Sequence, residues 1–82
     1  MTRLRLLGRH ACELCENLYA ALLADPVIAS AGVAWLDLDD APALRERYLY
    51  SIPVVLLEDD SEVWMGPVDG TTVDSLRSAL AR

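Results

Sequence analysis

The two cysteines of this chain, Cys12 and Cys15, stand at the junction between a short apolar run and a helical pattern. The apolar run, residues 4–7, predicts a strand, and Gly8 marks the turn after it. Two cysteines at this spacing in the first turn of a helix lie within reach of a disulfide. The helix dipole there favours the thiolate of the leading cysteine. Strand, loop, Cys-x-x-Cys and helix together predict a dithiol redox site.

The size of the chain limits its organisation. A length of 82 residues predicts one domain, residues 1–82, with no separate substrate-binding domain. No apolar stretch approaches the roughly 18 residues that cross a bilayer. The first apolar run is interrupted by Arg5 and lacks the cleavage site of a signal peptide, so we expect a cytoplasmic protein. Since a reducing cytosol does not maintain structural disulfides, a neighbouring cysteine pair there points to catalysis or metal binding.

The charge balance is acidic. Seven arginines, with no lysine, face thirteen acidic side chains, and the formal net charge is −6. A nucleic-acid-binding protein needs a basic face, so this balance argues against nucleic acid as a partner. We expect a monomer that binds neither nucleic acid nor a membrane, and whose partner is a disulfide-containing molecule.

Strand and helix patterns alternate along the chain. Strands are predicted at residues 3–7, 33–38, 52–57 and 62–65, and helices at residues 12–24, 42–49 and 71–80. Pro26 is expected to end the first helix, the aspartates before Pro42 to cap the second, and Thr71 with Asp74 to cap the last. The order β-α-β-α-β-β-α predicts an α/β fold, a four-stranded mixed sheet with helices on both faces. The first three strands are expected to be parallel, joined by right-handed crossovers.

Three features together resemble the glutaredoxin-like family of the thioredoxin-fold superfamily. They are Cys12-Glu13-Leu14-Cys15 after the first strand, Ile52-Pro53-Val54 at the start of the third, and the element order. Residues 9–15 are also similar to the site of small bacterial glutaredoxin-like proteins. The resemblance covers nearly the full chain and implies a thioredoxin-like fold with a cis peptide bond before Pro53.

The same resemblance implies roles for individual residues. Cys12 would be the attacking thiol, because it lies nearest the helix start, and Cys15 the resolving thiol. Pro53 would flank the sulfurs, and the backbone of Ile52 would pair with a bound extended peptide.

Further substrate-binding residues follow from the same comparison of motifs. Arg9 stands where glutaredoxins have a basic residue before the motif, and His10 follows it. Gly66 opens the segment that corresponds to their glycine pair and acid. Glu13 and Leu14 replace the usual Pro-Tyr between the cysteines. The implied activity is reduction of protein disulfides or glutathione mixed disulfides, with glutathione as co-substrate and no tightly bound cofactor or metal.

Other interpretations of the cysteine pair stay open. His10, Cys12 and Cys15 could be three metal ligands, but zinc normally takes four and the chain has no further cysteine or histidine. Small copper chaperones also carry Cys-x-x-Cys, in a β-α-β-β-α-β order. The helix start at Pro42 favours the redox interpretation instead. Two inert core thiols, or a thioredoxin-fold binding module without turnover, are the remaining alternatives.

The aromatic residues are interpreted mainly as structural. Trp35 and Trp64 are expected to pack on the faces of the sheet, because both lie in predicted strands. Tyr48 and Tyr50 stand near the expected Pro53 loop and could belong to the core or to a pocket. The acidic segment 37–40 is attributed to capping rather than to Mg²⁺ binding.

Overall fold

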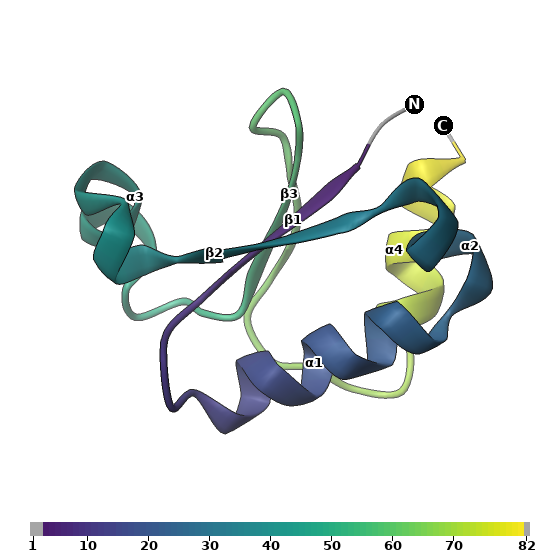
Figure 1. Cartoon of the computed structure of the whole chain (residues 1–82), viewed down its shortest axis with the longest axis horizontal. Helices are drawn as coiled ribbons and strands as arrows, with labels where there is room; N and C mark the ends of the chain where they lie inside the picture. The colour runs from purple at the N-terminus through teal and green to yellow at the C-terminus, as the bar shows by residue number, and fades with distance from the viewer. Residues whose placement is uncertain (1–2, 82) are drawn as a thin grey trace.

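The fold is built on a four-stranded mixed sheet, described here from a computed structural model that covers residues 3–81 (Figure 1). The strands are β1 (Leu4–Gly8), β2 (Val33–Asp37), β3 (Val54–Leu57) and β4 (Glu62–Met65). They lie in the order β2-β1-β3-β4, so that β1 and β3 are central and β2 and β4 form the edges. The predicted fold class and the alternation of strands and helices are confirmed.

The direction of β3 corrects the prediction of three parallel strands. β2 runs parallel to β1, but β3 runs antiparallel to it, with Leu7 opposite Val54 and Leu4 opposite Leu57. The helix between β2 and β3 has seven residues, which span about 10 Å. A connection with so short a helix leaves β2 and enters β3 at the same end of the sheet. The N-terminal end of β3 therefore lies beside the C-terminal end of β1.

In the described part of the chain, four α-helices and one short 3₁₀ helix connect and cover the strands. They are α1 (Glu13–Ala24), α2 (Pro26–Ala31), η1 (Leu38–Asp40), α3 (Pro42–Tyr48) and α4 (Thr72–Leu80). Among residues 3–81, no helix is both long and apolar enough to cross a membrane.

Helix α2 was not predicted. Pro26 does end α1, but it also begins α2, because proline is favoured in the first turn of a helix, where no backbone donor is needed. Two of the predicted caps were also wrong. Asp37 rather than Asp39 caps the segment after β2, where it opens η1, and α3 begins after Ala41 without a side-chain cap. The Thr71 side chain makes no cap bond on α4.

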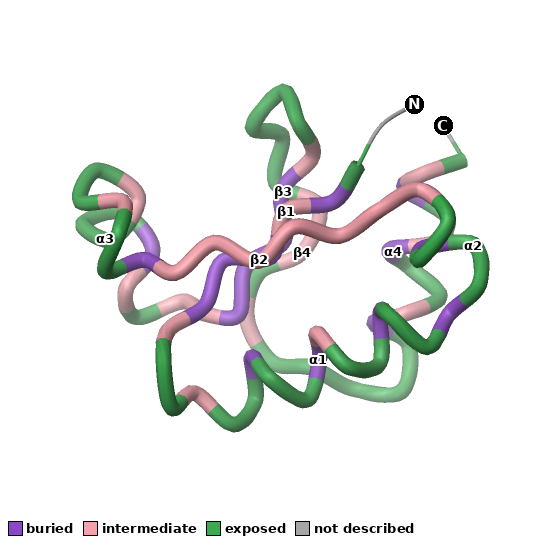
Figure 2. Tube along the Cα trace, viewed as in Figure 1, coloured by how far each residue is buried: buried purple, intermediate pink, exposed green. Residues whose placement is uncertain are grey.

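The sheet separates two clusters of buried side chains. Figure 2 marks the buried residues along the strands and helices. Alternate residues of β1 and β3 point to opposite faces, as the two-residue period of a strand requires. One face packs against α1, α2 and α4 through Leu4, Leu6, Val55, Leu18, Leu22, Ile28 and Leu76. The other packs against η1 and α3 through Leu7, Val54, Leu56, Leu38 and Tyr48. Helices on both faces are thereby confirmed, and Tyr48 belongs to the core.

A buried aspartate ties the helical layer together. Asp25 lies between α1 and α2, where Oδ1 accepts hydrogen bonds from the backbone N–H groups of Val27 and Ile28. Its Oδ2 accepts from the guanidinium of Arg77 on α4, at 2.9 Å from Nε. The hydrogen bond from Arg77 and that from the Ile28 N–H lower the pKa of Asp25, against the opposing effect of burial. One carboxylate thus caps a helix and holds a second helix against it.

Substitution at position 25 should separate these two roles. Asparagine also caps helices well, so Asp25→Asn should lose mainly the Arg77 pair, while Asp25→Ala should lose the cap too, lowering the thermal midpoint by about a further 4–8 °C. Because folding lowers the pKa of Asp25, its contribution is complete above the pKa of an unfolded aspartate. It is lost as the pH falls through the folded pKa.

The measurement is thermal unfolding of both variants and wild type across pH 2–7. Asp74→Asn is the matched control, because it removes the other, exposed carboxylate that pairs with Arg77. A difference between wild type and Asp25→Asn that persists unchanged in strong acid would contradict the assigned charge pair.

Candidate functional site

The site is centred on a disulfide at the start of α1. Cys12 is the N-cap of that helix, in an extended backbone conformation, and Cys15 lies in the first turn. The two Cα atoms are 5.3 Å apart and the sulfurs are bonded to each other. The backbone N–H of Cys15 donates to Sγ of Cys12 at 3.2 Å. The predicted placement of the pair at a helix N-terminus is confirmed, and Sγ of Cys12 occupies the position of a capping acceptor.

The two sulfurs differ in their access to solvent. Cys15 is completely buried, in the first turn of α1 and against the end of β1, whereas Cys12 is partly exposed. A molecule arriving from solution can therefore reach only the Cys12 end of the disulfide. The pair is not enclosed in the core, as the interpretation of two inert thiols would require.

Gly8 makes the buried position of Cys15 possible. A Cβ atom at Gly8 would come within 2.9 Å of Cβ of Cys15 and within 2.9 Å of Cη2 of Trp35. Real Cβ atoms do not approach so closely, so the absent side chain is what lets the indole and the cysteine pack against the end of β1. Trp35 thus packs against the same point of β1 as Cys15.

Two aspartates hold the loop before Cys12. Asp37 is the last residue of β2, and Asp39 lies in η1, which follows. The N–H of His10 donates to Oδ2 of Asp37 at 3.2 Å, and Oδ1 of Asp37 accepts from the N–H of Asp39. Ala11 adopts a left-handed conformation with φ of 64°, and the N–H of Cys12 donates to the Arg9 carbonyl, closing a tight turn. These contacts fix the position of Cys12 at the start of α1.

The cation next to the dithiol is already paired. The guanidinium of Arg9 lies 3.3 Å from a carboxylate oxygen of Asp39, which also binds Arg45. Burial acts to raise the pKa of Asp39, but the hydrogen bonds from Arg9 and Arg45 outweigh it and lower that pKa. Arg9, predicted to bind substrate, therefore takes part in a partly exposed ion pair within the protein.

The predicted residues on the other side of the dithiol are arranged by strand register. Gly8 lies opposite Asp37, Leu7 opposite Val54, and Val54 opposite Met65. Continuing the register by one residue places Pro53 beside Gly8, and Gly66 beside Pro53. The Ile52–Pro53 peptide bond is cis, and Gly66 has a φ of 101°. Ile52, Pro53 and Gly66 thus lie at the sheet end that carries the Cys12 loop, on the β3–β4 side.

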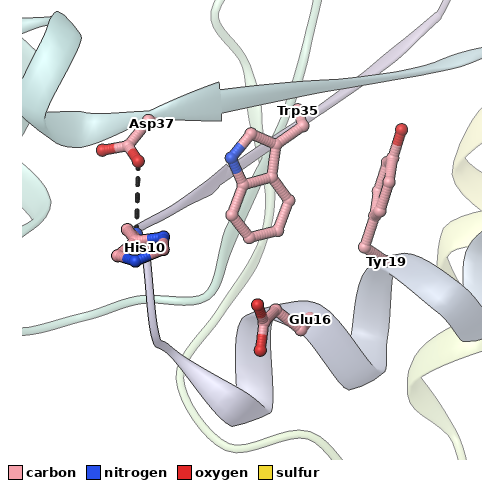
Figure 3. Close-up of a pocket in the computed structure, with 5 residues that line it drawn as sticks. All are labelled: His10, Glu16, Tyr19, Trp35 and Asp37. Carbon is pink, nitrogen blue, oxygen red and sulfur yellow. Dashed lines mark hydrogen bonds between the residues drawn. The ribbon is translucent and has the colours of Figure 1, made fainter.

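A pocket of about 290 Å³ lies on the opposite side, towards β2 (Figure 3). It is lined by His10, Glu16, Tyr19, Trp35 and Asp37. The rings of Tyr19 and Trp35 meet edge to face, with centroids 5.5 Å apart. Of these residues, only His10 was predicted to bind substrate, so the structure separates it from Ile52, Pro53 and Gly66.

Sequence reasoning missed Glu16 and Tyr19 as site residues and assigned Trp35 and Asp37 to packing and capping. One signal was present: Glu16 and Tyr19 are three residues apart and share a face of the first helix. The partner of that face comes from β2 and could not be read from local spacing. Within residues 3–81, no group of three or more histidine, cysteine, aspartate or glutamate side chains is arranged to hold a metal ion.

Exposed apolar side chains gather at the same end of the sheet. Leu14, between the cysteines, is 61% exposed, and Tyr50, just before Ile52, is 97% exposed. Met65 at the end of β4 and Val68 in the following loop are exposed as well.

Comparisons with known proteins agree with this geometry. A family model described as "Glutaredoxin-like domain (DUF836)" matches residues 3–80. The chain is similar to the solved structure of the structural-genomics target XcR50 from X. campestris, with 29% identity over 95% of each chain and a TM-score of 0.69. It is also similar to the protein Ne2328 from Nitrosomonas europaea, with 24% identity over 92% of this chain and 88% of that one, and a TM-score of 0.68.

A more distant likeness concerns the fold alone. Thioredoxin 1 from Thermosipho africanus superposes with a TM-score of 0.64 at 12% identity, over 96% of this chain and 94% of that chain. No curated protein matches the chain.

The close packing at Gly8 leads to a prediction. Gly8→Ala should destabilise the protein by about 1–3 kcal/mol, because Cβ of Cys15 belongs to a buried helix turn and cannot move aside easily. The matched control is Gly70→Ala, where an added Cβ would meet nothing within 4 Å. Denaturant unfolding of both variants measures the difference, and equal stabilities would show that the end of β1 does not hold the dithiol tightly.

Proposed function

Since the chain belongs to the family of glutaredoxin-like domains, we propose that it is a thiol–disulfide oxidoreductase that reduces protein disulfides or mixed disulfides with glutathione. The observation that carries this proposal is the asymmetry of the Cys12–Cys15 disulfide. One sulfur caps a helix at the surface and the other is buried behind it. A pair that cycles between bonded and free states needs one sulfur to meet the substrate and one to remain inside for the second step.

The reaction follows from this asymmetry. In the reduced protein, the Cys12 thiolate attacks a substrate disulfide, the substrate S–S bond breaks, and one substrate thiolate leaves and takes a proton from water. The thiolate of Cys15 then attacks Sγ of Cys12, and the second substrate thiolate leaves. The substrate gains two electrons and the protein ends as the Cys12–Cys15 disulfide. Two thiols of glutathione, or one reductase dithiol, return it to the reduced form.

The local charges around Cys12 act in opposite directions. The N-terminus of α1 and the N–H of Cys15 favour a negative charge on Sγ. Glu13 and Glu16 in the first turn oppose it. With Arg9 bound to Asp39, the backbone of α1 is the main support for the thiolate. A reducing compartment such as the cytosol would keep the pair ready to attack.

The surroundings of Cys12 favour a protein as substrate over free glutathione. Leu14, between the two cysteines, offers an exposed apolar contact next to the reactive sulfur, and Tyr50 and Met65 are exposed at the same end of the sheet. The residues that the family resemblance assigns to glutathione offer little free positive charge, because Arg9 is paired. The family resemblance implies that the Ile52 backbone, next to the cis bond, would pair with an extended peptide. Glutathione then serves best as the reductant, and the assay below compares the two roles.

Serine variants of the two cysteines test the proposal. Cys12→Ser should lower the reduction of insulin disulfides, and of a glutathionylated peptide, to the uncatalysed rate. Cys15→Ser should still attack, and should accumulate a mixed disulfide through Cys12 that mass spectrometry detects. Activity is followed with dithiothreitol as reductant in one arm, and with glutathione and its reductase in the other.

Each outcome has a clear meaning. Activity that survives Cys12→Ser would remove the catalytic assignment. A mixed disulfide found on Cys15 in the Cys12→Ser variant would reverse the two roles. Turnover in the dithiothreitol arm alone would exclude glutathione as the regenerating thiol.

A further inference from the structure

The pocket of His10, Glu16, Tyr19, Trp35 and Asp37 lies next to the dithiol, on the side away from Pro53. His10 precedes Cys12 by two residues. Glu16 is one helical turn after it, where its N–H donates to the Cys12 carbonyl at 3.0 Å. Trp35 packs where a Gly8 Cβ would also meet Cys15. The pocket is therefore built from the residues that flank the reactive sulfur, and a group attached near a bound substrate sulfur can reach it.

The walls of the pocket combine aromatic faces with carboxylates. Figure 3 shows the rings of Trp35 and Tyr19 standing side by side between β2 and α1, with the Glu16 and Asp37 carboxylates at the margin. An aromatic face next to a carboxylate attracts a cation, through the ring quadrupole and through direct charge.

The two carboxylates differ in how they are used within the protein. Both oxygens of Asp37 accept backbone N–H groups, which fixes its position. Among the described side chains, none pairs with the carboxylate of Glu16, which is exposed. Glu16 can therefore turn towards a ligand without giving up an existing contact.

The balance of charges around the pocket also disfavours an anionic occupant. Arg9, the arginine next to His10, is bound to Asp39. Glu13 adds a further negative charge in the first turn of α1, and the net charge of the chain is −6. A cleft with charges of one sign raises the local concentration of ligands of the opposite sign.

We propose that this pocket receives an ammonium or guanidinium group of the substrate, held close to the reacting disulfide. The inference rests on the proposed function and names the substrate class, which is a disulfide with a basic group beside it, such as a protein cysteine flanked by lysine or arginine. The cation lies between the Trp35 ring and Glu16 while the Cys12 thiolate attacks the adjacent sulfur. Substrates with a carboxylate in the same place are disfavoured.

Three small symmetrical disulfides that differ in charge provide the test. Cystamine carries two ammonium groups, bis(2-hydroxyethyl) disulfide is uncharged, and 3,3′-dithiodipropionate carries two carboxylates. The rate constant for reduction of each by the reduced full chain is divided by its rate constant with 2-mercaptoethanol. This division removes the intrinsic reactivity of each disulfide and the general effect of a thiolate on its charge.

The normalised rate constant for cystamine should exceed that of the uncharged disulfide by about tenfold, as expected of one cation–π contact with one exposed ion pair. That for dithiodipropionate should be the lowest. In 1 M salt, where charges are screened beyond about 3 Å, most of the preference should disappear.

A pair of matched variants locates the effect. Glu16→Gln should lower the ratio of the cystamine to the neutral rate constant by about threefold, because it removes the free carboxylate. Glu58→Gln removes the same charge from the β3–β4 hairpin at the opposite end of the sheet, and should leave the ratio unchanged. Using the ratio cancels any change that Glu16→Gln causes in the nucleophilicity of Cys12.

The outcomes separate this inference from the function on which it rests. Failure to reduce both insulin and the three small disulfides would overturn the proposed oxidoreductase, and the pocket assignment with it, whereas reduction of insulin but of none of the three would overturn the cationic pocket alone. Reduction of all three at equal normalised rates, or fastest for dithiodipropionate, would leave the oxidoreductase in place and overturn the cationic pocket. An equal fall of the ratio in both variants would also overturn it, because net charge and not the pocket would then set the preference.

Discussion

The antiparallel pairing of β3 with β1 is the constraint on which the site depends. The hydrogen-bond ladder sets Leu7 against Val54, and the next residues in register are Gly8 and Pro53. The parallel pairing of β2 sets Gly8 against Asp37 on the other side. Asp37, Gly8 and Pro53 therefore lie side by side in one row across the sheet, where β2 and β1 end and β3 begins. A slip of one residue would turn every side chain of β3 to the other face, so the buried side chains on both faces hold this row in place.

Close packing at Gly8 makes the two sulfurs differ in their exposure to solvent. Because β1 ends in a residue without a side chain, Cys15 and Trp35 both reach the backbone there. Cys15 is buried as a result, while Cys12 remains at the helix start, where its sulfur caps α1. The difference in burial between Cys12 and Cys15, which a two-step exchange would require, thus follows from the packing at Gly8.

The dithiol lies between two different surfaces. On the β3–β4 side are the cis peptide bond, Gly66 and exposed apolar side chains such as Tyr50 and Met65. On the β2 side is the aromatic and acidic pocket that includes Trp35 and Glu16. Under the proposed function, a polypeptide substrate that crosses Cys12 would meet both surfaces.

The sequence by itself determined the local features of this protein. The first strand and the Cys12–Cys15 pair at a helix start are set by residues close in the chain, and both appear where they were expected, but Gly8 ends β1 and the turn follows it at residues 9–12. The end of α1 at Asp25-Pro26 was predicted, but the start of α2 at the same proline was not. Only the tertiary structure decided the direction of β3 and the membership of the pocket, since both depend on contacts between segments far apart in the chain. The periodicity of apolar residues indicates which residues face the core, but not which strands pair or in which direction. The pairing is decided by how the helices cover the two faces of the sheet.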